Sequence, residues 1–202
     1  MGNLCVRLCR TCQYFLGDYL ILDMDQIRIK DKIFELYIDE ATLQSRVKAL
    51  AQQVNEDYAG KNPLLVPVLN GAFLFAADLI RELTIEPEIQ FFRVSTYGDS
   101  MSGIRRPALI MGQDIALKGR HVLVIEDIVD TGNTCDFLME YAKNQEVASV
   151  RLACLLYKPD SHRGANYPDY LGFSIPPEFV VGYGLDYAQK GREHNAIYRF
   201  KP

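Results

Sequence analysis

The 202-residue sequence contains no long hydrophobic run. Its longest apolar stretches, residues 64–69 and 121–125, fall far short of the roughly 20 residues that span a bilayer, so we expect no membrane partner. It also lacks a positive charge excess. The formal net charge of −4 argues against nucleic acid as the main partner. Internal repeats and low-complexity segments are absent as well.

Cysteines are few and irregularly placed. Three of the five, Cys5, Cys9 and Cys12, fall within the first twelve residues. An odd count without regular spacing does not describe a disulfide framework. Cys9 and Cys12 form a single C-x-x-C, but neither a second pair nor a surrounding strand–helix–strand pattern supports a zinc or redox role. We interpret the cysteines as reduced thiols, which favours a cytoplasmic protein.

Residues 1–23 lack the continuous apolar region of a secretory signal. Met24, followed by polar and charged residues, resembles an alternative start. We therefore expect residues 1–23 to be a dispensable extension and residues 24–202 to form one domain. A composition with 49% hydrophobic and 24% charged residues is typical of globular proteins.

Helical and strand patterns alternate along the chain. Apolar residues at helical spacing predict helices, and continuous apolar runs predict strands buried on both faces. The expected helices cover residues 41–58, 73–83 and 134–143, and the expected strands cover 64–69, 89–95, 108–111, 121–125, 149–157 and 179–183. Residues 97–103 and 164–177 are expected as loops, the second forming a hood beside the sheet. The predicted fold class is α/β: a single domain with a parallel sheet flanked by helices.

The most informative segment follows the predicted strand over residues 121–125. Glu126 and Asp127 come first, then Asp130, and then the turn Thr131-Gly132-Asn133-Thr134 opens a helix. Backbone N–H groups at a helix start, a glycine and flanking hydroxyls are what a phosphate site needs. The acids would repel a bare phosphate. They suit a ligand that also carries a divalent cation or sugar hydroxyls.

Other interpretations explain this segment less well. Asp130-Thr131-Gly132 is also the tripeptide of aspartic proteases, but these need a second copy or an all-β dimer. Paired acids at a strand end occur in phospho-acceptor receiver domains, where the phosphate-binding turn would have no use. A solvated acidic loop would not explain why acids, hydroxyls and a glycine converge at one strand end.

The segment 126–132 resembles the phosphoribosyl-diphosphate motif of the type I phosphoribosyltransferases, most closely those that act on 6-oxopurines. The resemblance extends from about residue 32 to residue 187. It implies a parallel sheet with a hood, Mg²⁺ as cofactor, a cytoplasmic location, and a homodimer or homotetramer. The implied reaction belongs to purine salvage: 5-phosphoribose passes from its 1-diphosphate to N9 of hypoxanthine, and of guanine, with release of diphosphate.

The resemblance also implies a role for each matching residue. Asp130 takes or shares the proton on purine N7, Lys158 donates to the 6-oxo group, and Phe179 stacks on the base. The ribose hydroxyls and the metal are expected to contact Glu126 and Asp127, and the metal also Asp186. The 5′-phosphate is expected to contact Asp130, Thr131, Gly132, Asn133 and Thr134, and the diphosphate to contact Leu69, Asn70, Gly71 and Arg192. Thr96 and Tyr97 are expected in a lid, and Val180 at the purine edge.

This sequence departs from the family pattern in places. Asn70 stands where many relatives carry Lys or Arg, Thr96 replaces a serine, and residues 193–196 differ from the usual pattern. In the family, the peptide bond before the position of Asn70 is often cis. None of the three histidines falls on a family site, and we expect His162 and Arg163 in a solvated loop.

One rival function uses the same fold. A non-enzymatic regulator would bind phosphoribosyl diphosphate as a signal and RNA or DNA as its output. Such a regulator needs a basic surface or a DNA-binding extension. The net charge of −4 and the lack of a recognisable helix-turn-helix favour the enzyme.

Overall fold

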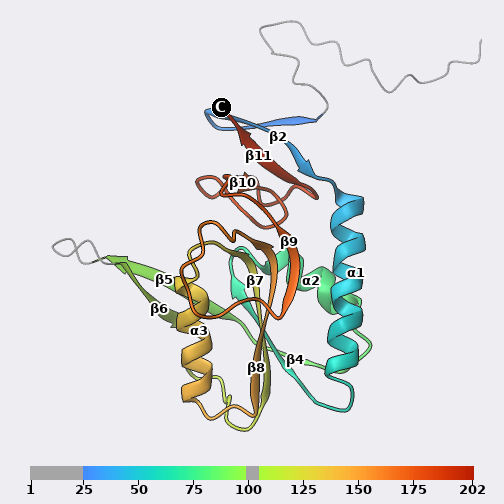
Figure 1. Cartoon of the computed structure of the whole chain (residues 1–202), viewed down its shortest axis with the longest axis vertical. Coiled ribbons are helices and arrows are strands. Elements are labelled where there is room, and N and C mark those ends of the chain that lie inside the picture. Colours follow the sequence, from blue (N-terminus) through green and yellow to red (C-terminus); the bar gives the residue numbers. More distant parts are fainter. Residues whose placement is uncertain (1–24, 99–104) are drawn as a thin grey trace, which may run out of the picture.

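A computed structural model describes residues 25–98 and 105–202, which form a large and a small sheet (Figure 1). The large sheet has the strand order β6–β5–β3–β7–β8–β9, with β4 beside β3. Neighbours from β5 to β9 run parallel, and β6 is antiparallel to β5. The strands of this sheet are β3 (Leu64–Leu69), β4 (Glu88–Ile89), β5 (Phe92–Gly98), β6 (Arg105–Met111), β7 (His121–Val129), β8 (Ser149–Tyr157) and β9 (Tyr170–Ser174).

Helices cover both faces of the large sheet, so the predicted α/β class is confirmed. The helices are α1 (Glu40–Asp57), α2 (Phe73–Arg81) and α3 (Asn133–Asn144). In β7, Leu123 and Ile125 pack with α1 and α2. Val122 and Val124 pack with α3 on the other face. Because successive side chains of a strand point to opposite faces, the apolar run of β7 is buried on both.

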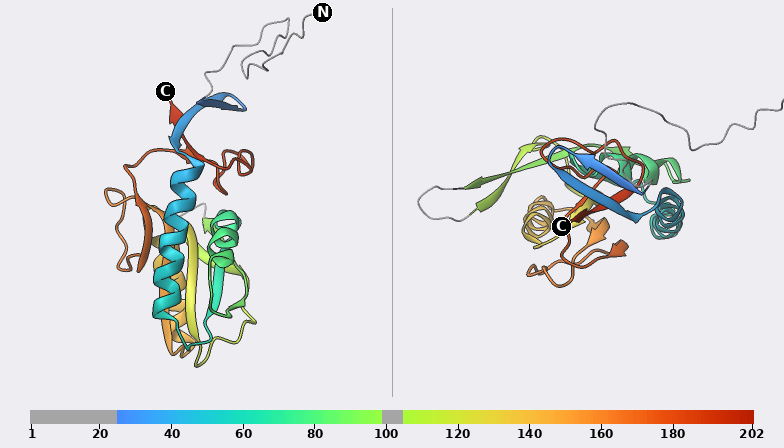
Figure 2. Two further views of the ribbon diagram at one scale, coloured as in Figure 1. Left: turned by 90° about the vertical axis from the view of Figure 1, so that its right-hand side faces the viewer. Right: turned by 90° about the horizontal axis from the view of Figure 1, so that it is seen from above.

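The small sheet forms the hood and has the antiparallel order β1–β2–β11–β10. Its strands are β1 (Gln26–Ile29), β2 (Lys32–Ile38), β10 (Val180–Val181) and β11 (Ile197–Lys201). The perpendicular views show the hood at the end of the large sheet where α1 begins (Figures 1 and 2). Its core is small and is built around Ile29, Phe34 and Val181.

Several predicted elements need correction. The predicted strand over 89–95 is instead two strands, β4 and β5, and β5 continues to Gly98, so residue 97 is not the start of a loop. Of the predicted strand over 179–183, only residues 180–181 form a strand, β10. The strand ends there because Gly182 and Tyr183 take positive φ angles of 95° and 51°. The loop predicted over 164–177 was expected to form the hood, but it contains β9, a strand of the large sheet. The hood is instead built by β1, β2, β10 and β11, of which β1, β2 and β11 were missed.

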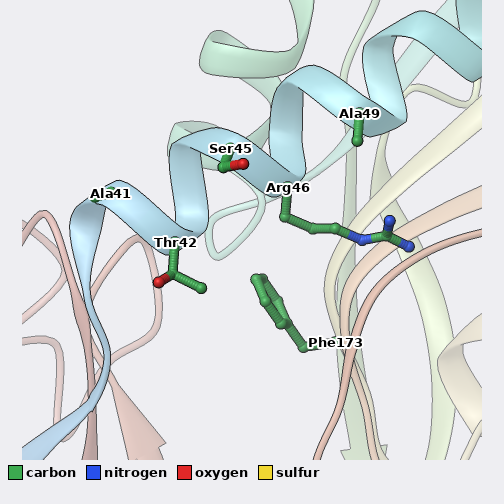
Figure 3. Close-up of a pocket in the computed structure, with 6 residues that line it drawn as sticks. All are labelled: Ala41, Thr42, Ser45, Arg46, Ala49 and Phe173. Carbon is green, nitrogen blue, oxygen red and sulfur yellow. The ribbon is translucent and has the colours of Figure 1, made fainter.

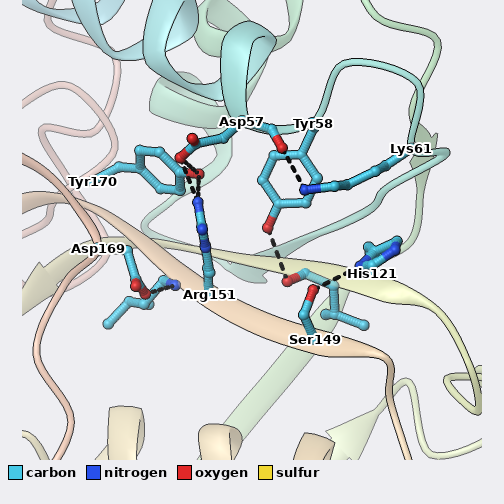
Figure 4. A network of polar contacts seen from close by, with 10 residues as sticks. Asp57, Tyr58, Lys61, His121, Ser149, Arg151, Asp169 and Tyr170 are labelled. Atoms are coloured by element: carbon cyan, nitrogen blue, oxygen red, sulfur yellow. Dashed lines mark hydrogen bonds and ion pairs between the residues drawn. The ribbon is translucent and has the colours of Figure 1, made fainter.

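A polar cluster ties α1 to the sheet at the end opposite the hood (Figure 4). The buried Tyr170 hydroxyl donates to Asp57 Oδ2 at 2.7 Å and accepts from Arg151 at the same distance. Arg151 also pairs directly with Asp57. The contacts join the last turn of α1 to β8 and β9.

An open groove of about 560 Å³ lies between α1 and β9, where Phe173 lies beneath the helix (Figure 3). It is lined by Ala41, Thr42, Ser45, Arg46, Ala49 and Phe173, none of which is a predicted site residue. Among the described residues, no helix combines the length and hydrophobicity required to cross a membrane.

Candidate active site

The predicted site residues of the large sheet lie at one edge because the strands that carry them are parallel neighbours. The loop 69–71 begins at the end of β3, the turn 130–134 follows β7, and Lys158 follows β8. In sheets of this kind, ligands bind beyond the carboxyl ends of the strands. The strand order β3–β7–β8 therefore places the three segments side by side.

Lys158 and Asp130 form an ion pair that follows from strand register. Val129 of β7 is paired with Tyr157 of β8, so Asp130 and Lys158, the residues that follow them, lie next to each other. The Lys158 backbone N–H donates to the Val129 carbonyl at 3.0 Å. Lys158 Nζ lies 2.8 Å from Asp130 Oδ2. The lysine side chain is only 10% exposed and the aspartate 46%, so a buried ammonium holds a carboxylate that is open to a ligand.

The turn 130–134 has the form of an anion site. Gly132 is the N-cap of α3 with φ 90°, a conformation in which glycine is strongly favoured, and no side chain caps the helix there. The first backbone N–H groups of α3 are thus available to an anion, and the helix dipole favours negative charge. A cavity of about 100 Å³ lies inside the turn and is lined by Glu126, Ile128, Val129, Asp130, Thr131, Gly132, Asn133, Thr134 and Cys135.

His162 packs beneath this turn, so its predicted place in a solvated loop is wrong. The side chain is 8% exposed, and its Nδ1 lies 2.9 Å from the Tyr157 hydroxyl. A methyl group at Gly132 would lie 2.5 Å from Nε2, so the imidazole fills the space below that glycine. Within the described chain, Nε2 has no hydrogen-bond partner. The ring also packs between Tyr157 and Tyr167, with centroid distances of 5.3 and 4.7 Å. The contact with Gly132 joins residues 30 positions apart, so it could not be predicted from the local sequence.

For phosphoribosyl diphosphate, the substrate that the family resemblance implies, replacing His162 by Ala is expected to raise KM roughly tenfold. The ring supports Gly132, and without it the turn loses its fixed shape for the phosphate. A tenfold change corresponds to about 1.4 kcal/mol. KM for the purine and kcat are expected to change less than about twofold, because the lost interaction would bind the ground state and the transition state equally. Steady-state kinetics with His121→Ala, at the opposite end of β7, as control would test this. Equal effects on both substrates would contradict it.

The loop after β3 approaches β7 very closely. The Leu69–Asn70 peptide bond is cis, as the resemblance implies. A methyl group at Gly71 would lie 1.6 Å from Asp127 Oδ2, so only glycine fits there. The Gly71 carbonyl in turn faces Gly184, which follows β10. The loop 69–71 therefore lies between the acids of β7 and the segment that descends from the hood.

Glu126 and Asp127 resist ionisation. Burial raises the pKa of Glu126 well above its ordinary value, and the nearby Asp127 raises it further. Burial also raises the pKa of Asp127 to about 6, and the charge of Asp186 adds to this effect. The hydrogen bond from the Ile128 N–H, at 2.9 Å, and the charge of Arg192 act in the opposite direction. A cation or hydroxyl donors would stabilise these carboxylates in their charged form.

Asp186 and Arg192 lie on the hood side of the same site. Asp186 Oδ1 pairs with Arg192 at 2.6 Å, and its Oδ2 accepts from the Gln189 N–H at 2.7 Å. Within residues 25–98 and 105–202, no group of three acidic, histidine or cysteine side chains gathers to enclose a metal ion. Mg²⁺ usually needs only one or two carboxylates and completes its shell with water and substrate oxygens. The charge of Asp186 raises the pKa of Asp127, and the resemblance implies that both carboxylates are metal ligands.

Replacing Asp127 by Asn is expected to stabilise the metal-free protein at neutral pH. The pKa of Asp127 is higher in the folded than in the unfolded protein, so folding favours its protonated form. The contribution of Asp127 to the free energy of unfolding is therefore fully present below about pH 4 and is lost as the pH rises through about 6. Asn cannot ionise, so the variant avoids this loss. The Tm difference should grow between about pH 4.5 and 7 and then stay constant at roughly 5 °C. Thermal scans in EDTA, with the exposed Asp114→Asn as control, would measure it. A variant less stable at pH 8 would contradict the assignment.

The remaining predicted residues lie on the hood and on the β5–β6 arm. Phe179, which directly precedes β10, is 45% exposed, whereas Val180 is buried. Thr96 and Tyr97 lie in β5 opposite Pro107 and Arg106. The β5–β6 pair projects from the body of the large sheet (Figures 1 and 2). The side chains of Thr96 and Tyr97, residues 99–104 and the extension 1–23 lie outside the described part, so their predicted roles stay predictions.

Known proteins resemble this chain in sequence and in overall fold. A family profile described as a phosphoribosyl transferase domain matches residues 38–188. The hypoxanthine phosphoribosyltransferase of Escherichia coli K12 is 42% identical over 161 residues, covering 78% of this chain and 90% of that protein. The hypoxanthine-guanine phosphoribosyltransferase of Streptococcus pneumoniae is 42% identical over 166 residues, covering 81% and 91%. A crystal structure of a Bacillus anthracis hypoxanthine-guanine phosphoribosyltransferase is similar with a TM-score of 0.77 and 36% identity, covering 82% of this chain and 97% of that one.

Proposed function

Since this chain belongs to the phosphoribosyltransferase family, we propose that it transfers 5-phosphoribose from 5-phosphoribosyl 1-diphosphate to N9 of hypoxanthine and of guanine. The products are the nucleotides IMP and GMP and free diphosphate. This is a purine-salvage reaction. The similar enzymes from Escherichia coli and Streptococcus pneumoniae, whose names specify these bases, support the proposal.

The observation that carries the proposal is the pair of Lys158 and Asp130. In a 6-oxopurine, N7 and O6 lie next to each other on one edge of the base. An ammonium and a carboxylate 2.8 Å apart match this edge, with Lys158 donating to O6 and Asp130 accepting from N7–H. N9 attacks C1′ of the ribose, the C1′–O bond breaks, and diphosphate leaves with the electron pair. Asp130 takes or shares the N7 proton, which makes N9 a better nucleophile.

The other site residues bind and orient the phosphorylated sugar. The turn 130–134 would hold the 5′-phosphate, and Asp127 with Glu126 would accept from the ribose hydroxyls. The loop 69–71 and Arg192 would contact the diphosphate. Glu126, Asp127 and Asp186 would hold Mg²⁺. Bound Mg²⁺ would neutralise charge on the leaving diphosphate. Most of the catalysis is then positioning and electrostatics.

Exclusion of water is the role proposed for the hood and for Thr96 and Tyr97. The ribose passes through an oxocarbenium-like state that bulk water would capture. Phe179 would stack on the base, and the backbone at Val180 would contact its edge. We further propose a homodimer or homotetramer in the cytoplasm, with residues 24–202 as the catalytic domain.

Turnover by the purified chain distinguishes this enzyme from a regulator. With Mg²⁺, phosphoribosyl diphosphate and hypoxanthine, we expect IMP and diphosphate in equal amounts, at roughly 1–10³ turnovers per second. The absorbance change on nucleotide formation measures the rate, and EDTA provides the control. Binding of phosphoribosyl diphosphate without turnover, for any of hypoxanthine, guanine, xanthine and adenine, would support the regulator instead.

A further inference from the structure

At the start of β2, Lys32 reaches an aromatic cluster in the hood. Lys32 Nζ lies 4.5 Å from the ring centroid of Phe200, 5.1 Å from that of Tyr187 and 5.9 Å from that of Phe179. A cation within about 6 Å of an aromatic centroid is attracted by the ring. One half-buried ammonium therefore attracts three rings from different segments of the chain.

The neighbouring residue holds one of the same rings by a hydrogen bond. The Tyr187 hydroxyl donates to Asp31 Oδ1 at 2.9 Å. This bond lowers the pKa of Asp31 and raises the pKa of Tyr187. Tyr187 meets Phe179 edge to face, with centroids 5.9 Å apart and planes at 84°. Asp31 and Lys32 thus both hold the tyrosine that borders Phe179.

Phe179 has little other packing to hold it. It is 45% exposed, and its remaining aromatic neighbour within the described chain is Phe34, at 6.1 Å. The Phe34 ring also packs near Tyr187 and Phe200, with ring centroids 6.2 and 5.9 Å apart, so all four rings form one connected cluster. The hood core below consists mainly of Ile29, Phe34 and Val181. An exposed ring over such a small core needs further contacts to keep one orientation.

We propose that Lys32 is a positioning residue for purine binding: it holds the ring of Phe179, directly and through Tyr187, in the orientation that stacks on the base. This inference rests on the proposed stacking role of Phe179. If the Phe179 ring already has the stacking orientation, less conformational entropy is lost when the base binds. Lys32 does not touch the substrate, so its effect should be confined to the affinity for the purine.

The test compares substitutions of Lys32 with a matched control in the same hairpin. Lys32→Met keeps the length of the side chain and removes the charge, and Lys32→Arg keeps the charge. Lys30→Met is the control, because Lys30 is exposed and lies two residues away. We expect Lys32→Met to raise KM for hypoxanthine roughly fivefold, with kcat and KM for phosphoribosyl diphosphate within about twofold. Lys32→Arg and Lys30→Met should resemble the wild type.

Combining Lys32→Met with Phe179→Leu separates this inference from the proposed function. If Lys32 acts through Phe179, Lys32→Met should add nothing to the higher KM of Phe179→Leu. Additive effects, or an unchanged KM in Lys32→Met beside a raised KM in Phe179→Leu, would overturn the role of Lys32 alone. An unchanged KM in Phe179→Leu would overturn the stacking role and the inference with it. Equal changes for both substrates, with a lower Tm, would show a structural role only.

Discussion

Replacing Asp130 by Asn is expected to lower kcat by about 10²-fold or more, while the affinity for phosphoribosyl diphosphate stays close to that of the wild type. The amide keeps the size of the side chain and an oxygen that can accept from Lys158, at the position where the carboxylate now lies 2.8 Å from Nζ. It cannot accept the N7 proton. An interaction needed in the transition state is lost, while ground-state binding of the sugar is retained.

Pre-steady-state kinetics and direct binding measurements would separate these two effects. Single-turnover rates report the chemical step, and calorimetric titration with phosphoribosyl diphosphate reports affinity. Asp160→Asn is the matched control, because Asp160 is an exposed acid two residues after Lys158. A single-turnover rate equal to that of the wild type would refute Asp130 as the proton acceptor. A parallel loss of sugar binding would show that the substitution distorts the turn.

Replacing Lys158 by Gln is expected to lower kcat/KM for hypoxanthine and to reduce the ratio of kcat/KM for hypoxanthine to kcat/KM for adenine. An ammonium has only donors, so it satisfies a 6-oxo group but leaves the amino group of adenine unpaired. A site built to hydrogen-bond a polar group rejects an analogue without it by about 10³-fold or more. Glutamine can present either its oxygen or its amide N–H, so the preference should largely disappear.

The measurement is kcat/KM for both bases in the wild type and the variant. Lys118→Gln is the matched control, because that lysine is 78% exposed and pairs with Glu146 on the surface. A hypoxanthine-to-adenine ratio unchanged by Lys158→Gln would place the purine-reading group elsewhere. A wild type that already uses adenine well would do the same.

The central strands of the large sheet were predictable because their signal is local. The strands over 64–69 and 149–157 have the predicted bounds, since their central residues, 64–68 and 152–156, are apolar and buried on both faces. β7 continues to Val129, four residues beyond its predicted end, so Glu126 and Asp127 lie within its last four residues and the turn 130–134 follows it. Their place near the carboxyl end of this strand was predictable too. Helix α3 is one residue longer at each end than expected, a difference within the fraying of helix ends.

The hood was not predictable, because its strands pair over long sequence distances. β2 pairs with β11, and Phe34 lies opposite Phe200. Short strands with mixed polarity give little local signal, and their burial depends on a partner far away in the sequence. The same reason applies in part to His162, which packs under Gly132, 30 residues earlier in the chain, as well as against its sequence neighbours Tyr157 and Tyr167. The family resemblance assigned Lys158 and Asp130 separately, whereas their pairing depends on the β7–β8 register.

A competition assay tests most directly whether the Lys158–Asp130 pair selects 6-oxopurines. Equal concentrations of hypoxanthine, guanine and adenine are incubated with the purified chain, Mg²⁺ and limiting phosphoribosyl diphosphate, and the nucleotides are separated by chromatography. Product ratios then equal the ratios of kcat/KM. The account predicts IMP and GMP, with AMP lower by about 10³-fold. AMP in amounts comparable to IMP, or no nucleotide from any base, would contradict it.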